Sequence, residues 1–129
     1  MKKVSIIERG WAGHFICGQR CTFRRNTLIQ YGKRRIVVST VGMMMDIRKG
    51  EGYYDTIGAG GRYYETMAFR AKLDGPYWDA DVSETVSFNS EWAICADALA
   101  KLPKDADNKA NDMHDAVVRE LSRKIRNMK

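Results

Sequence analysis

The chain has 129 residues, of which 44% are hydrophobic and 29% charged, and its formal net charge is +6. This length fits one domain with a real core, and the near-average composition excludes a disordered or fibrous design. No apolar run approaches the roughly 18 residues that span a bilayer, and Glu8 and Arg9 interrupt the start before a secretory signal forms. We therefore expect a single domain over residues 1–129, in the cytoplasm and without a membrane partner.

The charge is unevenly distributed along the sequence. Residues 1–50 carry eleven Lys and Arg against Glu8 and Asp46, which gives +9. Residues 51–115 carry six bases against thirteen acids, a net −7, and residues 116–129 return to +4. A basic zone beside an acidic one predicts a dipolar surface that steers association with an acidic partner.

The first two-thirds of the chain are typical of β-strands joined by glycine-rich turns. A short β-branched run predicts a strand over Val4–Ile7, and an edge segment is expected near His14–Ile16. The clearest element is a hairpin with arms Thr27–Tyr31 and Arg34–Val41, because two β-rich runs flank a two-residue turn that contains a glycine.

Further strands are expected over Tyr53–Ile57, Arg62–Ala71 and Glu84–Phe88, separated by turns rich in Gly and Asp. After the last strand, Asn89 or Ser90 is a suitable N-cap for a short helix through Leu99. Trp92, Cys95 and Leu99 would share one face of that helix.

The C-terminal segment predicts a long amphipathic helix. Its apolar face recurs at a spacing of 3.6 residues and consists of Ala110, Met113, His114, Val117, Val118, Leu121, Ile125 and Met128. Acids in the first turns and bases in the last match the helix dipole. The sequence thus predicts an α+β fold, an antiparallel sheet of about five strands packed by this helix and the shorter preceding one.

Zinc binding is the first chemistry to weigh. His14, Cys17 and Cys21 lie within eight residues, and His114 or Cys95 would be the fourth ligand of a tetrahedral site. The spacing is poor, because CGQRC has three intervening residues and no second cysteine pair follows. We therefore expect half-buried or core thiols, no metal and no cofactor.

Two other roles for the cysteines, a disulfide framework and a catalytic thiol, have less support. Three cysteines in a chain large enough to fold without staples argue against a disulfide framework and favour reduced thiols. Cys21 lies between Arg20 and Arg24, which would lower the pKa of a catalytic thiol, so a small thiol- or metal-dependent enzyme remains a third hypothesis.

Two other motifs are better explained without a ligand. The glycine turn in IGAGGRYYE matches neither the GxGxxG nor the Walker pattern, so we interpret it as a tight turn. The carboxylates Asp74, Asp79, Asp81 and Glu84 do not follow the EF-hand spacing. We interpret their segment as a solvated acidic loop.

A basic cluster with interleaved aromatic residues lies in and beside the predicted hairpin. Its members are Arg20, Arg24, Arg25, Lys33, Arg34 and Arg35, with Phe23 and Tyr31. Arginines on a β-ribbon pair with phosphates while aromatic rings stack on bases, so a nucleic acid is one candidate partner. The same residue types are enriched at protein interfaces. A solvated face without a partner is the third interpretation of this cluster.

The segments IERGWAGHF, CTFRRNTL, RIVVSTVG, YYETMAF and KANDMHDAVV resemble those of small uncharacterised proteins encoded by bacteriophages and prophages. The resemblance covers most of the chain but carries no catalytic residues. It implies a compact accessory protein, and such proteins often bind and block a host protein, including components of antiviral defence.

The leading hypothesis is a non-enzymatic phage or prophage accessory protein that binds a host protein or protein–nucleic acid complex through the basic hairpin cluster. A direct nucleic-acid-binding protein is the alternative. The sequence leaves open the identity of the partner and the oligomeric state.

Overall fold

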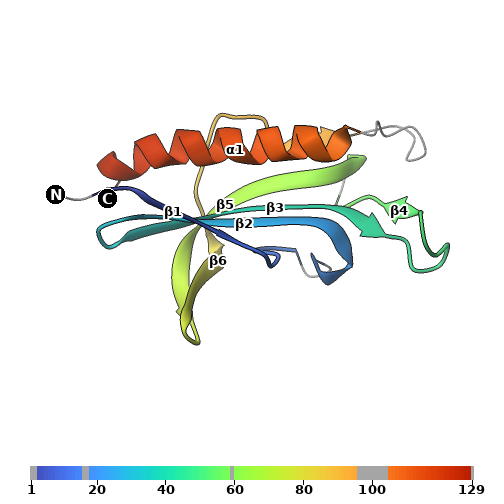
Figure 1. Ribbon diagram of the computed structural model, residues 1–129, viewed down its shortest axis with the longest axis horizontal. Helices are drawn as coiled ribbons and strands as arrows, with labels where there is room; N and C mark the ends of the chain where they lie inside the picture. Colours follow the sequence, from blue (N-terminus) through green and yellow to red (C-terminus); the bar gives the residue numbers. More distant parts are fainter. Residues whose placement is uncertain (1–2, 16–17, 59, 96–104, 129) are drawn as a thin grey trace.

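The computed structural model describes residues 3–15, 18–58, 60–95 and 105–128. Figure 1 shows one long helix lying above a twisted sheet. The strands are Ser5–Arg9 (β1), Cys21–Tyr31 (β2), Arg34–Met45 (β3), Tyr54–Asp55 (β4), Arg62–Asp74 (β5), Tyr77–Thr85 (β6) and Ala93–Cys95 (β7). The helical segments are the 3-10 turn Gly18–Arg20 (η1), the helix Ala106–Lys124 (α1) and the 3-10 turn Ile125–Asn127 (η3).

The strands form one antiparallel sheet in the order β1-β2-β3-β5-β6, with β4 paired to β3 and β7 paired to β5. The predicted hairpin is confirmed as β2 and β3, and both arms are longer than expected. Its pairing begins at Tyr31 and Arg34 and continues to Cys21 and Met44. Gly32 occupies the turn with a φ of 60°, a conformation that costs glycine least.

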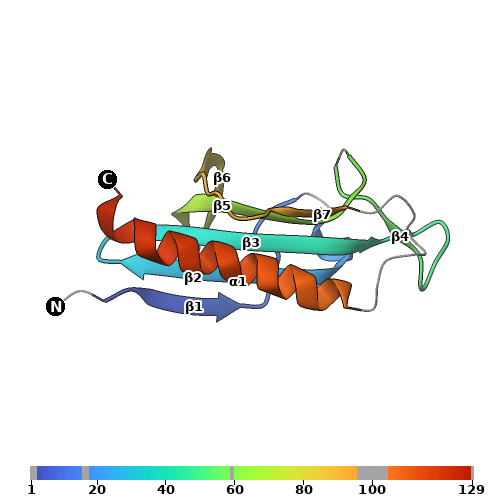
Figure 2. The same ribbon diagram turned by 90° about the horizontal axis from the view of Figure 1, so that it is seen from above.

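The predicted C-terminal amphipathic helix is confirmed as α1, which lies along one face of the sheet (Figure 2). Side chains on a strand alternate between faces, so Ile36 and Val38 of β3 point toward the helix. They pack against Val117 and Leu121, which are fully buried. Such burial contributes roughly 2 kcal/mol per side chain to folding. No helix among the residues described is long and apolar enough to cross a membrane.

A second cluster lies under the beginning of α1. The rings of Phe23 on β2 and Tyr64 on β5 meet edge to face, with centroids 5.4 Å apart. Both residues pair directly with Gly42 on the central strand β3. The Tyr64 hydroxyl donates to Asp107 Oδ1 at 2.6 Å, in the first turn of α1. This contact ties the start of the helix to the sheet.

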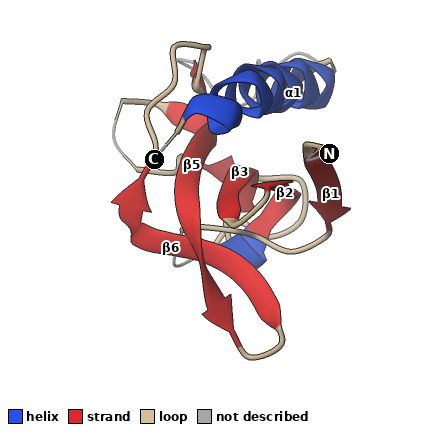
Figure 3. Ribbon diagram, turned by 90° about the vertical axis from the view of Figure 1, so that its left-hand side faces the viewer, coloured by secondary structure: helices blue, strands red, loops and turns tan. Residues whose placement is uncertain are grey.

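The other face of the sheet is partly covered by its own last hairpin. The β5–β6 pairing changes register between Phe69 and Ala71, and beyond this irregularity the two strands turn away from the helix (Figure 3). Asp79 on β6 then accepts a hydrogen bond from Asn26 on β2 at 3.2 Å. Because Asn26 lies on the face away from α1, the hairpin reaches back across that face.

The predicted shorter helix is wrong over the residues described. Ala93–Cys95 form β7, paired with Arg62–Glu65 of β5, and Leu99 lies outside the described residues. The backbone N–H groups of Asn89 and Ser90 donate to Glu120 on α1 at 2.7 and 2.9 Å. Burial opposes the Glu120 charge, but hydrogen bonds from Lys124 and these residues outweigh it and lower its pKa to about 2.

The strand count and several boundaries also differ from the prediction. The described residues form seven strands instead of about five. The segment interpreted as an acidic loop contains the turn at Gly75 and most of β6, which ends at Thr85 and so overlaps little with the predicted strand Glu84–Phe88. His14 lies outside any strand, and Ile16 lies outside the described residues.

Candidate basic docking surface

One end of the molecule gathers basic side chains from separate elements, and we call it the basic pole. Its members are Lys3, Lys33, Arg34, Arg35, Arg70, Arg123, Lys124 and Arg126. In Figure 1 this is the end where the β2–β3 turn, both marked termini and the end of α1 lie together. The opposite end carries the start of α1 and the β3–β4 connection. There the acids Asp46, Glu51, Asp55, Glu91, Asp105, Asp107 and Asp112 outnumber the described bases Arg20, Arg48, Lys49, Arg62 and Lys109.

Direct contacts hold the basic pole together. Arg34 Nη1 donates to the carbonyl oxygens of Ile125 and Arg126 at 3.1 and 2.7 Å. A cation at the last carbonyls of a helix is favoured by the helix dipole. Arg70 on β5 pairs across the sheet with Ile36, which is two residues after Arg34. Thus β5 contributes a base to the pole, as do the β2–β3 turn and the end of α1.

Most charges of the pole are not neutralised internally. Lys124 pairs with Glu120 at 2.7 Å. Within the described part of the chain, no ion pair involves the other members, and Lys33, Arg70 and Arg123 are exposed. Glu84 also lies near this end, because its neighbour Thr85 pairs with Phe69. One nearby acid does not offset seven bases without an ion pair, so the pole remains strongly positive.

Aromatic rings fix the position of three guanidinium groups at the pole. The guanidinium carbons of Arg34 and Arg126 lie 5.8 and 6.0 Å from the centre of the Tyr31 ring. That of Arg35 lies 4.1 Å from the Trp78 ring, and Arg35 Nε donates to Gln30 Oε1 at 2.8 Å. Cation–π contacts of this kind orient the guanidinium plane. Arg34 and Arg35 use part of their N–H groups on protein acceptors, and their remaining N–H groups can pair with an anion.

The structure separates the eight residues of the predicted binding cluster into two groups. Tyr31, Lys33, Arg34 and Arg35 lie at the basic pole. The other four, Arg20, Phe23, Arg24 and Arg25, lie on η1 and the first half of β2. Arg25 is six positions before Tyr31, which is roughly 20 Å along an extended strand.

Each of these four has a different environment. Phe23 is buried in the core beside Tyr64, and Arg20 donates to the Met45 carbonyl at 2.9 Å. Arg24 and Arg25 point to opposite faces, because consecutive strand residues alternate. Only Arg24 is exposed, and it faces away from α1.

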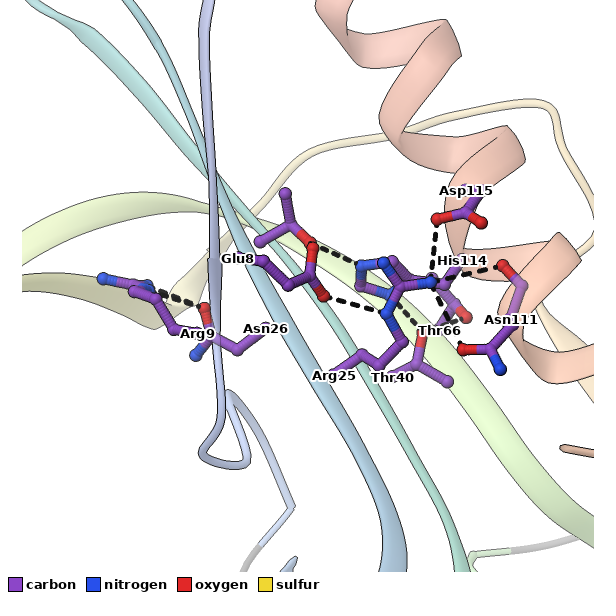
Figure 4. Close-up of polar contacts among 10 residues, drawn as sticks. Glu8, Arg9, Arg25, Asn26, Thr40, Thr66, Asn111, His114 and Asp115 are labelled. Carbon is purple, nitrogen blue, oxygen red and sulfur yellow. Dashed lines mark hydrogen bonds and ion pairs between the residues drawn. The ribbon is translucent and has the colours of Figure 1, made fainter.

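Arg25 joins the sheet to the helix. Its Nε donates to Glu8 Oε1 at 2.8 Å, and its Nη1 donates to Asp115 Oδ1 at 2.7 Å (Figure 4). Burial disfavours the Glu8 charge, but hydrogen bonds from Arg25 and Thr27 outweigh it and lower the pKa of Glu8. Arg25 is therefore engaged between β1 and α1 and is not a free docking charge.

His114 lies fully buried at the centre of a hydrogen-bonded chain that crosses the sheet under α1 (Figure 4). Thr27 Oγ1 donates to Glu8 Oε2 at 2.6 Å, so its oxygen accepts from His114 Nε2 at 2.7 Å. Nδ1 then accepts from Thr40 Oγ1 at 2.7 Å, and Thr40 accepts from Thr66 at 2.6 Å. The hydrogen count assigns the Nε2–H tautomer of a neutral imidazole.

A second histidine contributes to a polar group on the opposite face. His14 Nδ1 lies 2.7 Å from Ser39 Oγ, and Nε2 lies 3.1 Å from Glu65 Oε1. The order Ser-His-Glu resembles a hydrolase triad, but Ser39 is fully buried and also accepts from the Gly13 N–H at 3.1 Å. Neither histidine thus presents a free nitrogen beside an accessible nucleophile.

The candidate metal and thiol residues do not converge where they are described. Both nitrogens of His14 and of His114 are already hydrogen-bonded. Cys95 is exposed on β7, Cys21 is buried on β2, and Cys17 lies outside the described residues. No group of three or more His, Cys, Asp or Glu suited to a metal ion occurs among the residues that the structure describes.

Sequence reasoning missed five of the eight residues of the basic pole. Lys3, Arg70, Arg123, Lys124 and Arg126 were not connected with the hairpin, although the bases at the end of the helix were expected to complement its dipole. The missing information was tertiary, because α1 ends beside the β2–β3 turn.

No protein-family model, curated protein or solved structure matches the chain.

Proposed function

We propose that the protein is a non-enzymatic binding protein that engages the anionic surface of a host macromolecule through the basic pole. The observation that carries the proposal is the gathering of unneutralised bases from three elements at one end. Maintaining such a concentration of like charge costs stability through self-repulsion. Binding of a partner with the opposite charge would relieve this repulsion, which explains why the protein concentrates bases here.

The polar groups of the interior support binding over catalysis. The two histidines use their nitrogens within the protein, and Ser39 is inaccessible to a substrate. A general base must reach the proton that it abstracts. The resemblance to small phage and prophage proteins adds a biological context, an accessory protein that acts on a bacterial host component such as a defence complex.

The test is a triple charge reversal, Lys33→Glu, Arg70→Glu and Arg123→Glu. These side chains are exposed, so the fold should be retained. The matched control reverses Arg48, Lys49 and Lys109, which are also exposed but lie toward the other end. Arg25 and Arg34 are left unchanged because they hold α1.

Affinity purification from the bacterial host followed by mass spectrometry should recover a partner with the wild type and with the control variant. The pole variant should lose that partner while keeping the wild-type circular dichroism spectrum. Equal recovery by the pole variant would contradict the proposal. A nuclease-treated sample separates protein partners from nucleic acid.

A further inference from the structure

We infer that the basic pole binds the phosphate backbone of a nucleic acid. The inference rests on the proposed function and names the chemistry of the partner at the same surface. It concerns phosphate contacts alone, without reading of base sequence.

The first argument is the kind of cation. Five of the eight bases at the pole are arginines, namely Arg34, Arg35, Arg70, Arg123 and Arg126. A guanidinium group presents a fork of N–H donors that pairs with two oxygens of a phosphate. Three of these groups are placed by the rings of Tyr31 and Trp78, which reduces the side-chain entropy lost on binding.

The second argument is what the pole lacks. Protein interfaces are built around a buried apolar or aromatic centre with a polar rim. Most of the large apolar side chains that are exposed on the described surface lie away from the pole, and only Leu73, paired with Trp78, and Ile6, paired with Ile29, border it. Of the apolar residues at the pole, Val4, Tyr31 and Met128 are partly buried against the core. An interface that is mainly cationic is typical of nucleic-acid binding.

The third argument is the position of the acids. At the opposite end the acids outnumber the described bases, and Asp105, Asp107 and Asp112 begin α1, so a polyanion is attracted there less than at the pole. Contact is therefore limited to the pole, so each molecule should cover a few nucleotides and should not coat a strand cooperatively. The charge asymmetry of the chain thus predicts a short binding site on the nucleic acid.

The experiment measures fluorescence anisotropy of a short labelled DNA duplex, and of the corresponding single strand, with the full chain. Affinity should fall steeply as salt rises from about 50 to about 200 mM, because each bound phosphate releases counterions. The triple pole variant should bind on the order of 100-fold more weakly at low salt, and its salt slope should be shallower by about one unit for each phosphate that it no longer binds. The variant with Arg48, Lys49 and Lys109 reversed should bind like the wild type.

Polyglutamate is the second probe, since it presents carboxylates in place of phosphates. The inference is supported if the protein binds DNA and if polyglutamate displaces that DNA only at a much higher concentration of charged groups. Binding of polyglutamate through the pole without binding of DNA overturns the nucleic-acid assignment and leaves the proposed function standing. If neither DNA nor polyglutamate binds, both the nucleic-acid inference and the proposed function are overturned. If the pole variant and the control variant lose affinity equally, the assignment of binding to the pole is overturned.

Discussion

Acidification from pH 6.5 to pH 4 should lower the free energy of unfolding by about 3 kcal/mol through His114 alone. Burial, reinforced by the nearby Arg25 charge, lowers the pKa of His114 to about 4 from 6.5. Glu8 and Asp115 oppose this shift but do not cancel it. Between these two pH values the unfolded chain binds a proton that the folded chain does not, so stability falls as the pH falls.

Urea unfolding at a series of pH values between 7.5 and 4 measures this decrease. In the variant His114→Gln the side chain keeps a donor and an acceptor but does not titrate, so the difference between its slope and that of the wild type isolates His114. Equal slopes would contradict the account. Nitrogen-15 NMR of the wild type provides a measurement that does not depend on the variant, and it should show protonated Nε2 and unprotonated Nδ1 at neutral pH.

The substitution Gly42→Ala should destabilise the protein by about 3 kcal/mol. A Cβ atom at Gly42 would overlap Cδ2 of Tyr64 and would lie 2.8 Å from the Tyr63 carbonyl oxygen. The Tyr64 ring cannot move freely, because it packs on Phe23 and its hydroxyl donates to Asp107. Relief of the clash therefore disturbs the packing of α1 on the sheet.

Gly10→Ala is the matched control for this substitution. A Cβ atom at Gly10 meets nothing within 4 Å, and its backbone does not require a positive φ. Its effect on the unfolding midpoint should be small. A Gly42 variant that unfolds at the same denaturant concentration as the Gly10 variant would show that the close packing of Tyr64 against β3 is not maintained in solution.

Elements with strong local signals were predicted well from the sequence. The turn at Gly32 and the 3.6-residue spacing in the last quarter of the chain each require only neighbouring residues, and they indicated the β2–β3 hairpin and α1. The segment around Trp92 and Cys95 has helical spacing as well, but β5 offers a free edge with which Ala93–Cys95 pair. That competing interaction is distant in the sequence and invisible to local patterns.

The basic cluster shows the same limit at the level of the site. Strand alternation alone separates Arg24 from Arg25, so this part of the prediction was within reach of the sequence. The partners of Arg34 are carbonyl groups more than ninety positions away, at Ile125 and Arg126. Only the docking of α1 reveals that the end of the helix and the hairpin turn form one charged surface.

The most direct test of the central claim is a titration of isotope-labelled protein with the short DNA duplex, followed by amide chemical shifts in NMR spectra. The account predicts that the largest shifts occur at residues 32–35 and 123–127, with Arg70 beside them. Shifts concentrated at residues 22–25 of β2, with none at the pole, would contradict it.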